Sequence, residues 1–399
     1  MSKETQVTVQ RAKVAVAVVF LLNGLAFASW VSRVPALKDA LSLTPGGVGL
    51  LLLCLSGGTL VALPLSGAVI GRLGPARTVL TGATLTGLGL LVMGLGVGVA
   101  AVPVVGLGMF AYGIGTSGWD VAMNVEAADV EHRLDRTIMP RFHAGFSLGT
   151  VLGALVGAAC ARLDVALSSQ LVGTVVVIAL VVPVSLRRFL PVEDADQRDT
   201  RPRPSLLSAW REPRTLAIGL LVMAFALCEG IANDWLALSL VDGYGAVESV
   251  GAIGFGVFVA AMTLGRLFGG SPVERFGRVA VLRATAGLVV AGVLVVVLSP
   301  GLPGAMAGAV LWGLGASLGF PLGMSAAADE EDRAAVRLSV VSSIGYAAFL
   351  GGPPLVGLLA DHVGVRHAIL VACGAAVVGL LVAPAARSRR TSRADRLPA

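Results

Sequence analysis

Long apolar blocks alternate along this chain with short clusters of charged and turn-forming residues. A helix needs about 20 predominantly apolar residues to cross about 30 Å of hydrocarbon. Twelve blocks come close to that length, and they span residues 14–34, 46–70, 78–99, 103–125, 142–161, 167–186, 215–240, 249–270, 279–299, 303–326, 338–360 and 366–385. The pattern therefore predicts an all-α membrane protein with 12 transmembrane helices.

The first block imitates a secretion signal, because Lys13 precedes it and Ala-Phe-Ala stands at residues 26–28. The apolar run continues to Val34, however, and eleven more blocks follow. We therefore expect this block to remain in place as the first transmembrane helix.

Two motifs recur 200 residues apart. GIGTS (113–117) is followed by AADVEHR (127–133), and GLGAS (313–317) is followed by AADEEDR (327–333). A repeat of this length indicates that the second half of the chain copies the first.

A second motif recurs within each half. Its copies are GAVIGRLG (67–74), GAACARLD (157–164), GSPVERFG (270–277) and GLLADHVG (357–364). Successive copies stand three spans apart and so fall on opposite sides of the membrane, which is typical of inverted three-helix repeats. We therefore expect two six-helix bundles with pseudo-twofold symmetry, formed by residues 1–188 and 214–399, the second with a short basic tail. Residues 189–213, rich in Arg, Asp and Pro, are predicted to form a cytoplasmic linker.

Composition agrees with this picture, since 56% of the 399 residues are hydrophobic and only 14% are charged. With the amino terminus inside, most Lys and Arg residues are cytoplasmic, and only Arg33, Lys38, Arg162 and Arg366 fall outside. The net charge of +6 is therefore explained by membrane topology and does not indicate nucleic-acid binding. The distribution of basic residues predicts that both termini are cytoplasmic. The expected location is a plasma membrane or a bacterial inner membrane. The four isolated cysteines are interpreted as packing residues.

The chain carries no phosphate-binding GxxxxGK[ST] loop, no metal-ligand cluster and no nucleophile triad. We therefore expect neither an enzyme nor an ATP-driven pump, and no cofactor. The expected partners are a small-molecule solute, protons and the lipid bilayer, with no nucleic acid, and we expect a monomer.

The loop between spans 8 and 9 reads G-x-x-x-[DE]-R-x-G-[RK], with Gly270, Glu274, Arg275, Gly277 and Arg278 in the defined positions. It resembles the signature loop of the major facilitator superfamily. The copy after span 2 departs from it, because Gly71 stands where the acid is expected. The resemblance implies the fold of that superfamily and a role in transport.

A finer resemblance is to the fucose permease-like branch, the sugar:proton symporters. It rests on Asp120-x-x-x-Asn124, on RFHAGFSLG (141–149), on Glu229 with Trp235, and on GRLFG (265–269). It implies that a sugar or a sugar derivative is the first class of solute to test.

Three acids lie inside apolar spans: Asp120, Glu229 and Asp234. A charge at the centre of a bilayer costs about 2.5 to 3.5 kcal/mol on insertion scales, so an acid there indicates function by default. Burial favours the protonated form of a carboxyl group, which lets it take up and release a proton. We therefore predict proton coupling at Asp120 and Glu229, with His143 as a possible shuttle group. The alternatives are a permanently paired strut for Asp120, a solvated span end for His143, and simple hydration for Asp234.

Polar and aromatic residues near these acids are candidates for binding the solute. Asn124 follows Asp120 by one turn and Asn233 follows Glu229 by one turn, and Asn23 lies at mid-span in the first helix. The full set of candidates is Asn23, Asn124, Asn233, Trp30, Trp235 and Arg266. Interhelical hydrogen bonding is the alternative for Asn23, an interfacial belt is the alternative for the tryptophans, and neutralising an acid is the alternative for Arg266.

Charged residues in the repeated loops are predicted to gate the cytoplasmic side. These residues are Arg72, Glu131, Arg133, Glu274, Arg275, Glu331 and Arg333. Pairs among them would hold the cytoplasmic ends together in the outward-facing state, whereas ordinary surface pairs would contribute about 0 to 1 kcal/mol each.

The sequence as a whole predicts a proton-coupled secondary transporter that moves a small polar organic solute by alternating access. The alternative is a proton-driven exporter of a drug or a secondary metabolite. A receptor or a lipid scramblase that uses the same fold is the alternative from another class.

Overall fold

The computed structural model describes residues 3–134, 138–190 and 209–387, and within these ranges the regular structure is helical. The helices of the first half are α1 (Lys3–Val31), α2 (Val34–Ala40), α3 (Pro45–Gly98), α4 (Val102–Leu134), α5 (Met139–Arg162) and α6 (Leu167–Leu186). Those of the second half are α8 (Pro213–Tyr244), α9 (Glu248–Phe268), α10 (Gly270–Phe276), α11 (Arg278–Leu298), α12 (Leu302–Ala316), α13 (Gly319–Ala327), α14 (Glu331–Val363), α15 (Val365–Ala368), α16 (Val371–Val382) and the 3₁₀ helix η1 (Ala383–Ala386).

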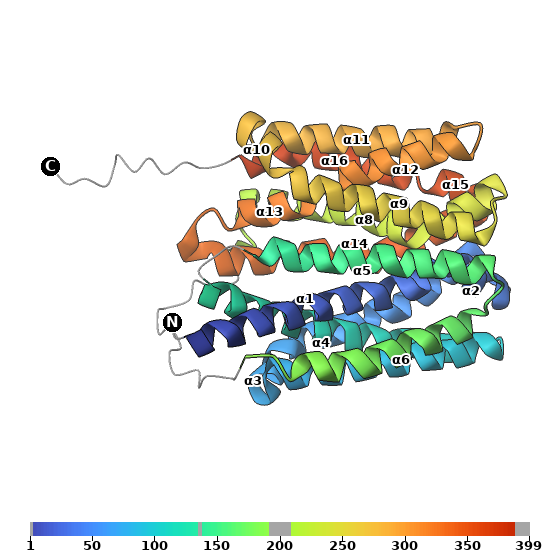
Figure 1. Ribbon diagram of the computed structural model, residues 1–399. Helices are drawn as coiled ribbons and strands as arrows, with labels where there is room; N and C mark the ends of the chain where they lie inside the picture. Colours follow the sequence, from blue (N-terminus) through green and yellow to red (C-terminus); the bar gives the residue numbers. More distant parts are fainter. Residues whose placement is uncertain (1–2, 135–137, 191–208, 388–399) are drawn as a thin grey trace.

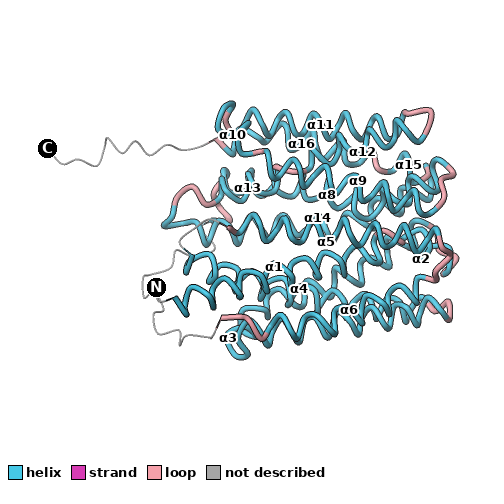
Figure 2. The backbone as a smooth tube through the Cα atoms, in the orientation of Figure 1, coloured by secondary structure: helices cyan, strands magenta, loops and turns pink. Residues whose placement is uncertain are grey.

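The helices run roughly side by side, and the two halves of the chain occupy opposite sides of the molecule (Figure 1). Short loops join the helices at the two ends of the bundle (Figure 2). We call the end where α1 begins the terminal end, and the opposite end, where α2 lies, the far end.

Ten of the described helical segments are long and apolar enough to cross a membrane. Two further spans bring the set to the twelve that the sequence predicts. The 54 residues of α3 contain two spans, and α4, with 33 residues, carries polar side chains such as Asp120 that lower its hydropathy. The predicted fold class is confirmed, although α1 begins at Lys3 instead of residue 14.

The four copies of the second sequence motif each end at a residue with a positive φ angle. Their last residues, Gly74, Asp164, Gly277 and Gly364, have φ angles of 75°, 53°, 79° and 79°. With ψ angles of 165°, 160° and 151°, the three glycines lie in a region that is essentially restricted to glycine. Asp164 has a smaller positive φ, which aspartate tolerates. The motif therefore marks a local backbone reversal at the end of a helix.

Pseudo-twofold symmetry is visible where the halves meet, because α3 packs on α14 and α5 packs on α9. Glycines allow the first contact to be very close. A Cβ atom added to Gly49 would lie 2.6 Å from the carbonyl oxygen of Pro353, and one added to Gly357 would lie 2.7 Å from that of Pro45. The two backbones therefore touch at the far end.

Polar contacts reinforce this closure. The guanidinium of Arg33, before α2, pairs with Glu248 at the start of α9, and Lys38 Nζ lies 2.9 Å from a carboxylate oxygen of Asp242. Asp361 of α14 accepts a hydrogen bond of 2.9 Å from the backbone N–H of Gly46, in the first turn of α3. A carboxylate at a helix N-terminus is stabilised by the helix dipole. The far end is therefore held shut by ionic contacts between the halves.

At the terminal end, a group of ion pairs lies within the second half. Arg333 and Arg337 contact the Glu212 carboxylate at 2.6 and 2.7 Å, and Arg214 and Arg278 contact that of Asp329 at 3.0 and 2.6 Å. Burial alone would raise the pKa of Glu212, but hydrogen bonds from Thr215 and Arg337 and the nearby arginine charges outweigh it and lower that pKa. These contacts brace the second half internally.

A cavity between the two halves

A cavity of about 320 Å³ lies between the halves and is lined by residues of α1, α3, α4, α5, α8 and α14. Its wall therefore belongs to both halves of the chain. This is where the solute site lies in transporters built from two repeats.

Helical periodicity explains which side chains of the first half reach the cavity. Asn23, Phe27 and Trp30 follow one another by four and three residues on α1, and Thr116 and Asp120 are four apart on α4. Residues with this spacing share one face of a helix. Helix α1 thus presents a mixed polar and aromatic stripe to the cavity, and α4 presents a polar one.

The second half contributes two further stripes. On α8 they are Gly230, Asn233 and Asp234, and on α14 they include Tyr346 and Phe349. Asp234, which the sequence places toward the outer end of its span, is therefore a cavity residue.

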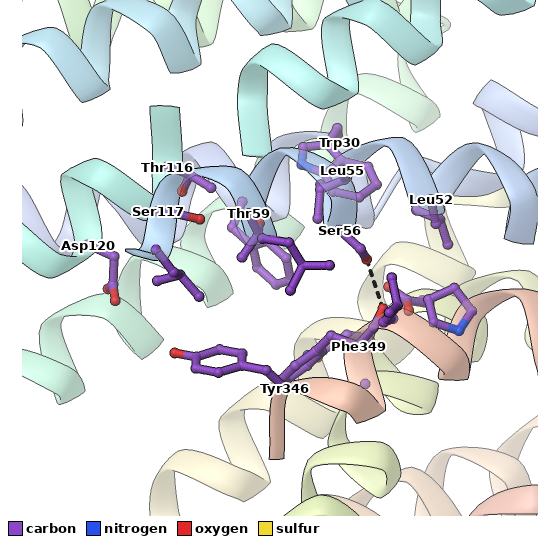
Figure 3. Close-up of a pocket in the computed structure, with 18 of the residues that line it drawn as sticks. Trp30, Leu52, Leu55, Ser56, Thr59, Thr116, Ser117, Asp120, Tyr346 and Phe349 are labelled. Atoms are coloured by element: carbon purple, nitrogen blue, oxygen red, sulfur yellow. Dashed lines mark hydrogen bonds between the residues drawn. The ribbon is translucent and has the colours of Figure 1, made fainter. Parts of the chain in front are cut away.

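Asp120 is exposed and faces the open space of the cavity, with its carboxylate turned toward the side where Tyr346 lies (Figure 3). Asn124, one turn further along α4, donates from Nδ2 to the Asp120 backbone oxygen at 2.9 Å and to Oδ1 at 3.5 Å. In the described part of the chain, Asp120 makes no ion pair. Its carboxylate is therefore accessible and carries a charge that no arginine or lysine neutralises.

Asn23 is only 3% exposed, and only one of the two polar atoms of its side-chain amide has a hydrogen-bond partner. Thr116 Oγ1 donates to Asn23 Oδ1 at 3.5 Å, whereas Nδ2 finds no acceptor among the described residues. An unpaired buried donor is destabilising by about 1 to 3 kcal/mol. The side chain is therefore suited to bind an oxygen that enters the cavity.

Glu229 and Arg266 contact each other instead of the cavity. Arg266 Nη2 donates to Glu229 Oε2 at 2.9 Å, and Arg266 Nε donates to the backbone oxygen of Ser317 at 3.2 Å. The side chain of Arg266 is 32% exposed, and that of Glu229 is 20% exposed. The positive charge of Arg266 thus neutralises Glu229.

Replacing Glu229 by Gln is expected to lower the midpoint of thermal unfolding, because it leaves the Arg266 guanidinium without a carboxylate inside a span. The loss should be about 1 to 2 kcal/mol, between the values for exposed and for buried pairs. Thermal unfolding of the detergent-purified protein measures it. The double variant Glu229→Gln, Arg266→Gln should recover most of the loss, and a single variant as stable as the wild type would contradict the pairing.

The predicted binding residue Trp235 and the predicted proton-shuttle residue His143 are not among the residues that line the cavity. Trp235 is fully buried and packs near Gly357, in the close contact between the halves at the far end. His143 is exposed and stands edge-on to the ring of Phe20, with 5.3 Å between ring centroids.

The predicted gating residues occupy different settings at the terminal end. Arg72, Glu274 and Arg275 are exposed, and the guanidinium of Arg275 lies 5.2 Å from the ring centre of Phe276. Glu131 accepts hydrogen bonds of 2.6 Å from the backbone N–H groups of Ile138 and Met139 at the start of α5.

The arginines of the repeated motif are paired locally. Arg133 contacts Asp129 at 3.1 Å, and Arg333 contacts Glu212 at 2.6 Å. The side chain of Glu331 lies outside the part that the structure describes. Each described ion pair of these arginines joins residues of the same half.

Sequence reasoning missed the aromatic lining of the cavity, formed by Phe27, Phe146, Tyr346 and Phe349. It also missed the hydroxyl groups of Ser56, Thr59, Thr116 and Ser117. One signal was available for two of the rings, because Phe146 and Tyr346 are related by the 200-residue repeat. Rings at equivalent positions of two halves are expected to face the same central space.

A family model described as Major Facilitator Superfamily matches residues 16–329 and 235–399. The Uncharacterized transporter y4wD of Sinorhizobium fredii is 33% identical over 369 residues, which are 92% of this chain and 96% of that protein.

Two solved structures share the architecture. The nucleoside transporter NupG, in a mutant form, gives a TM-score of 0.78 at 14% identity and covers 94% of this chain and 99% of its own. The E. coli fucose:proton symporter FucP, in a mutant form, gives a TM-score of 0.63 at 16% identity, and the match covers 95% of this chain and 98% of that chain. At such identities the likeness concerns the fold alone. The paired halves, the cavity between them and the matches along most of the sequence agree, and this chain belongs to the Major Facilitator Superfamily of membrane transporters.

Proposed function

We propose that this protein is a proton-coupled secondary transporter that moves a small polar organic solute by alternating access. The observation that carries the proposal is Asp120, an accessible carboxylate without an ion-pair partner in the described chain, in a cavity lined by both halves. A sugar or a sugar derivative is the first solute class, since hydroxyl groups suit the amides of Asn23 and Asn233. The fucose:proton symporter shares the fold.

Protonation of Asp120 would remove a charge from the cavity and so ease the passage of the loaded site between the two sides. One proton that crosses 100 mV supplies about 2.3 kcal/mol, enough to concentrate a neutral solute on the order of 50-fold. Asp120 would thus link the solute gradient to the proton gradient.

The terminal end is proposed to be cytoplasmic, because most of the arginines lie in the connections on that side. Since the far end is closed by contacts between the halves, this state would open inward. The exposed charges of Arg72, Glu274 and Arg275 are then free to pair across the halves when the terminal end closes.

Replacing Arg275 by Ala is expected to shift the population toward the state open at the terminal end. A surface contact contributes up to about 1 kcal/mol, so the shift should be at most about fivefold. Distances between spin labels on the two halves at the terminal end measure it. Arg283→Ala, which removes an exposed arginine of α11, is the matched control, and an unchanged distance distribution for Arg275→Ala would contradict the gate.

The proposed function is tested by thermal stabilisation of the purified protein with glucose, galactose and fucose, at acidic and at near-neutral pH. A ligand that binds the folded state raises its stability according to its concentration and affinity. A proton symporter should be stabilised more strongly at acidic pH, and solute should drive proton uptake into proteoliposomes. Proton movement opposite to the solute would favour the exporter, and no proton movement with any solute would end the proposal.

A further inference from the structure

The charge in the cavity is unbalanced. Asp120 and Asp234 both line it, and no lysine, arginine or histidine does so among the described residues. Arg266 is engaged with Glu229 at 2.9 Å. Two carboxylates within the membrane-spanning part of the bundle are costly unless a cation or a proton joins them.

Aromatic rings from both halves line the same cavity as these carboxylates. Phe27 and Trp30 stand nearly perpendicular, with 86° between their planes and 6.2 Å between their centroids. Tyr346 and Phe349 come from the other half, with centroids 6.3 Å apart (Figure 3). A cation over a ring face gains about 0.5 to 2 kcal/mol. Rings combined with carboxylates therefore suit an alkylammonium group.

Asp234 is better placed than Asp120 to meet such a cation. It follows Gly230 by one turn on α8, and a Cβ atom added to Gly230 would lie 3.5 Å from the ring of Phe349. Asp120 already receives a weak hydrogen bond of 3.5 Å from Asn124. The two acids therefore have different neighbours, and they can take different roles.

The second independent observation is the unpaired amide of Asn23. The side chain is 3% exposed, and Nδ2 has no acceptor in the described chain although Asn23 is among the residues that line the cavity. A ligand oxygen, such as that of a hydroxyl group, would satisfy this donor. A solute that satisfies both features carries an amine and at least one hydroxyl.

We propose that the transported solute is a hydroxylated amine in its protonated form, such as an amino sugar, with its ammonium group on Asp234 and a hydroxyl on Asn23. Asp120 remains the site of the coupled proton, so this inference rests on the proposed function and narrows its solute class.

The test compares matched pairs of probes by thermal stabilisation of the full-length protein in detergent: glucosamine with glucose, and galactosamine with galactose. Each amine should stabilise the wild type at a concentration about tenfold or more below that of its neutral partner. Asp234→Asn should abolish this preference, and Asp234→Glu should keep it. Asp39→Asn, a change at an acid that is 72% exposed at the far end, is the matched control and should keep it too.

Equal stabilisation by amine and neutral sugar would overturn the inference, as would a preference that survives Asp234→Asn or the absence of stabilisation by both amines. Size-exclusion profiles and unliganded melting points verify that the variants are folded. The outcomes for the two proposals are separate. Proton uptake driven equally by neutral sugars would contradict the amine solute and support the proton-coupled transporter. An amine preference without any proton movement would support the amine solute and contradict proton coupling.

Discussion

Replacing Asp120 by Asn is expected to abolish proton-driven accumulation of solute in proteoliposomes. The amide has nearly the same shape as the carboxyl but cannot release a proton, so the solute gradient loses its link to the proton gradient. For a neutral sugar, accumulation should fall from a limit on the order of 50-fold at 100 mV to no more than equilibration. The change is measured as uptake of labelled solute into proteoliposomes, driven by an imposed membrane potential.

Exchange of solute across the membrane without net proton movement should persist in this variant, because Asn imitates the protonated acid. Persistence of exchange therefore separates a lost coupling group from a misfolded protein. Asp39→Asn should accumulate solute as the wild type does. Full proton-driven accumulation by Asp120→Asn would end the assignment of this residue.

Replacing Arg33 by Ala is expected to open the far end. Arg33 is only 4% exposed, and it joins Glu248 of the other half as well as Gln170, whose oxygen lies 2.8 Å from Nη1. Removing one partner of a buried ion pair costs about 3 to 5 kcal/mol. Because Glu248 is 25% exposed and can be hydrated in part, we expect the lower value, which is about 100-fold in the equilibrium between the two states. Spin-label distances across the far end measure the populations.

Arg33 also braces its own half through Gln170, so a second variant is needed. Glu248→Gln removes the charge that crosses between the halves and leaves that bracing intact, and it should shift the populations in the same direction. Arg162→Ala, at an exposed arginine at the far end, should not. If both Arg33→Ala and Glu248→Gln left the distances unchanged, the closure would rest on backbone packing alone.

The length of the apolar blocks carried most of the information about the fold. A hydropathy window counts apolar residues, so it located the spans but not the helix ends. The helix α1 therefore extends to Lys3 in the polar region before the first block. The window also passed over α2, which has seven residues at the far end, but it separated the two spans of α3, at residues 46–70 and 78–99, on either side of Gly74.

The candidate site residues were predictable where their position depends on the sequence pattern of a single helix. An acid inside an apolar span marked Asp120, and helical spacing explains why Asn23 and Trp30 share a face toward the cavity. Contacts between distant segments were not predictable, because no local pattern reports them. Arg33 was counted only as a charge outside the membrane, and its partner Glu248 is 215 positions away.

The glycine contact between α3 and α14 affects how easily the far end closes when the protein changes between its two states. Where Gly49 meets Pro353 and Gly357 meets Pro45, the surfaces that close are backbone, with few rotatable side chains to immobilise. Ordering a long side chain costs up to about 2 kcal/mol of conformational entropy, and glycine has none to lose. This contact can therefore form with little entropic penalty, and the cost of ordering side chains on closure falls on the ion pairs of Arg33 and Lys38.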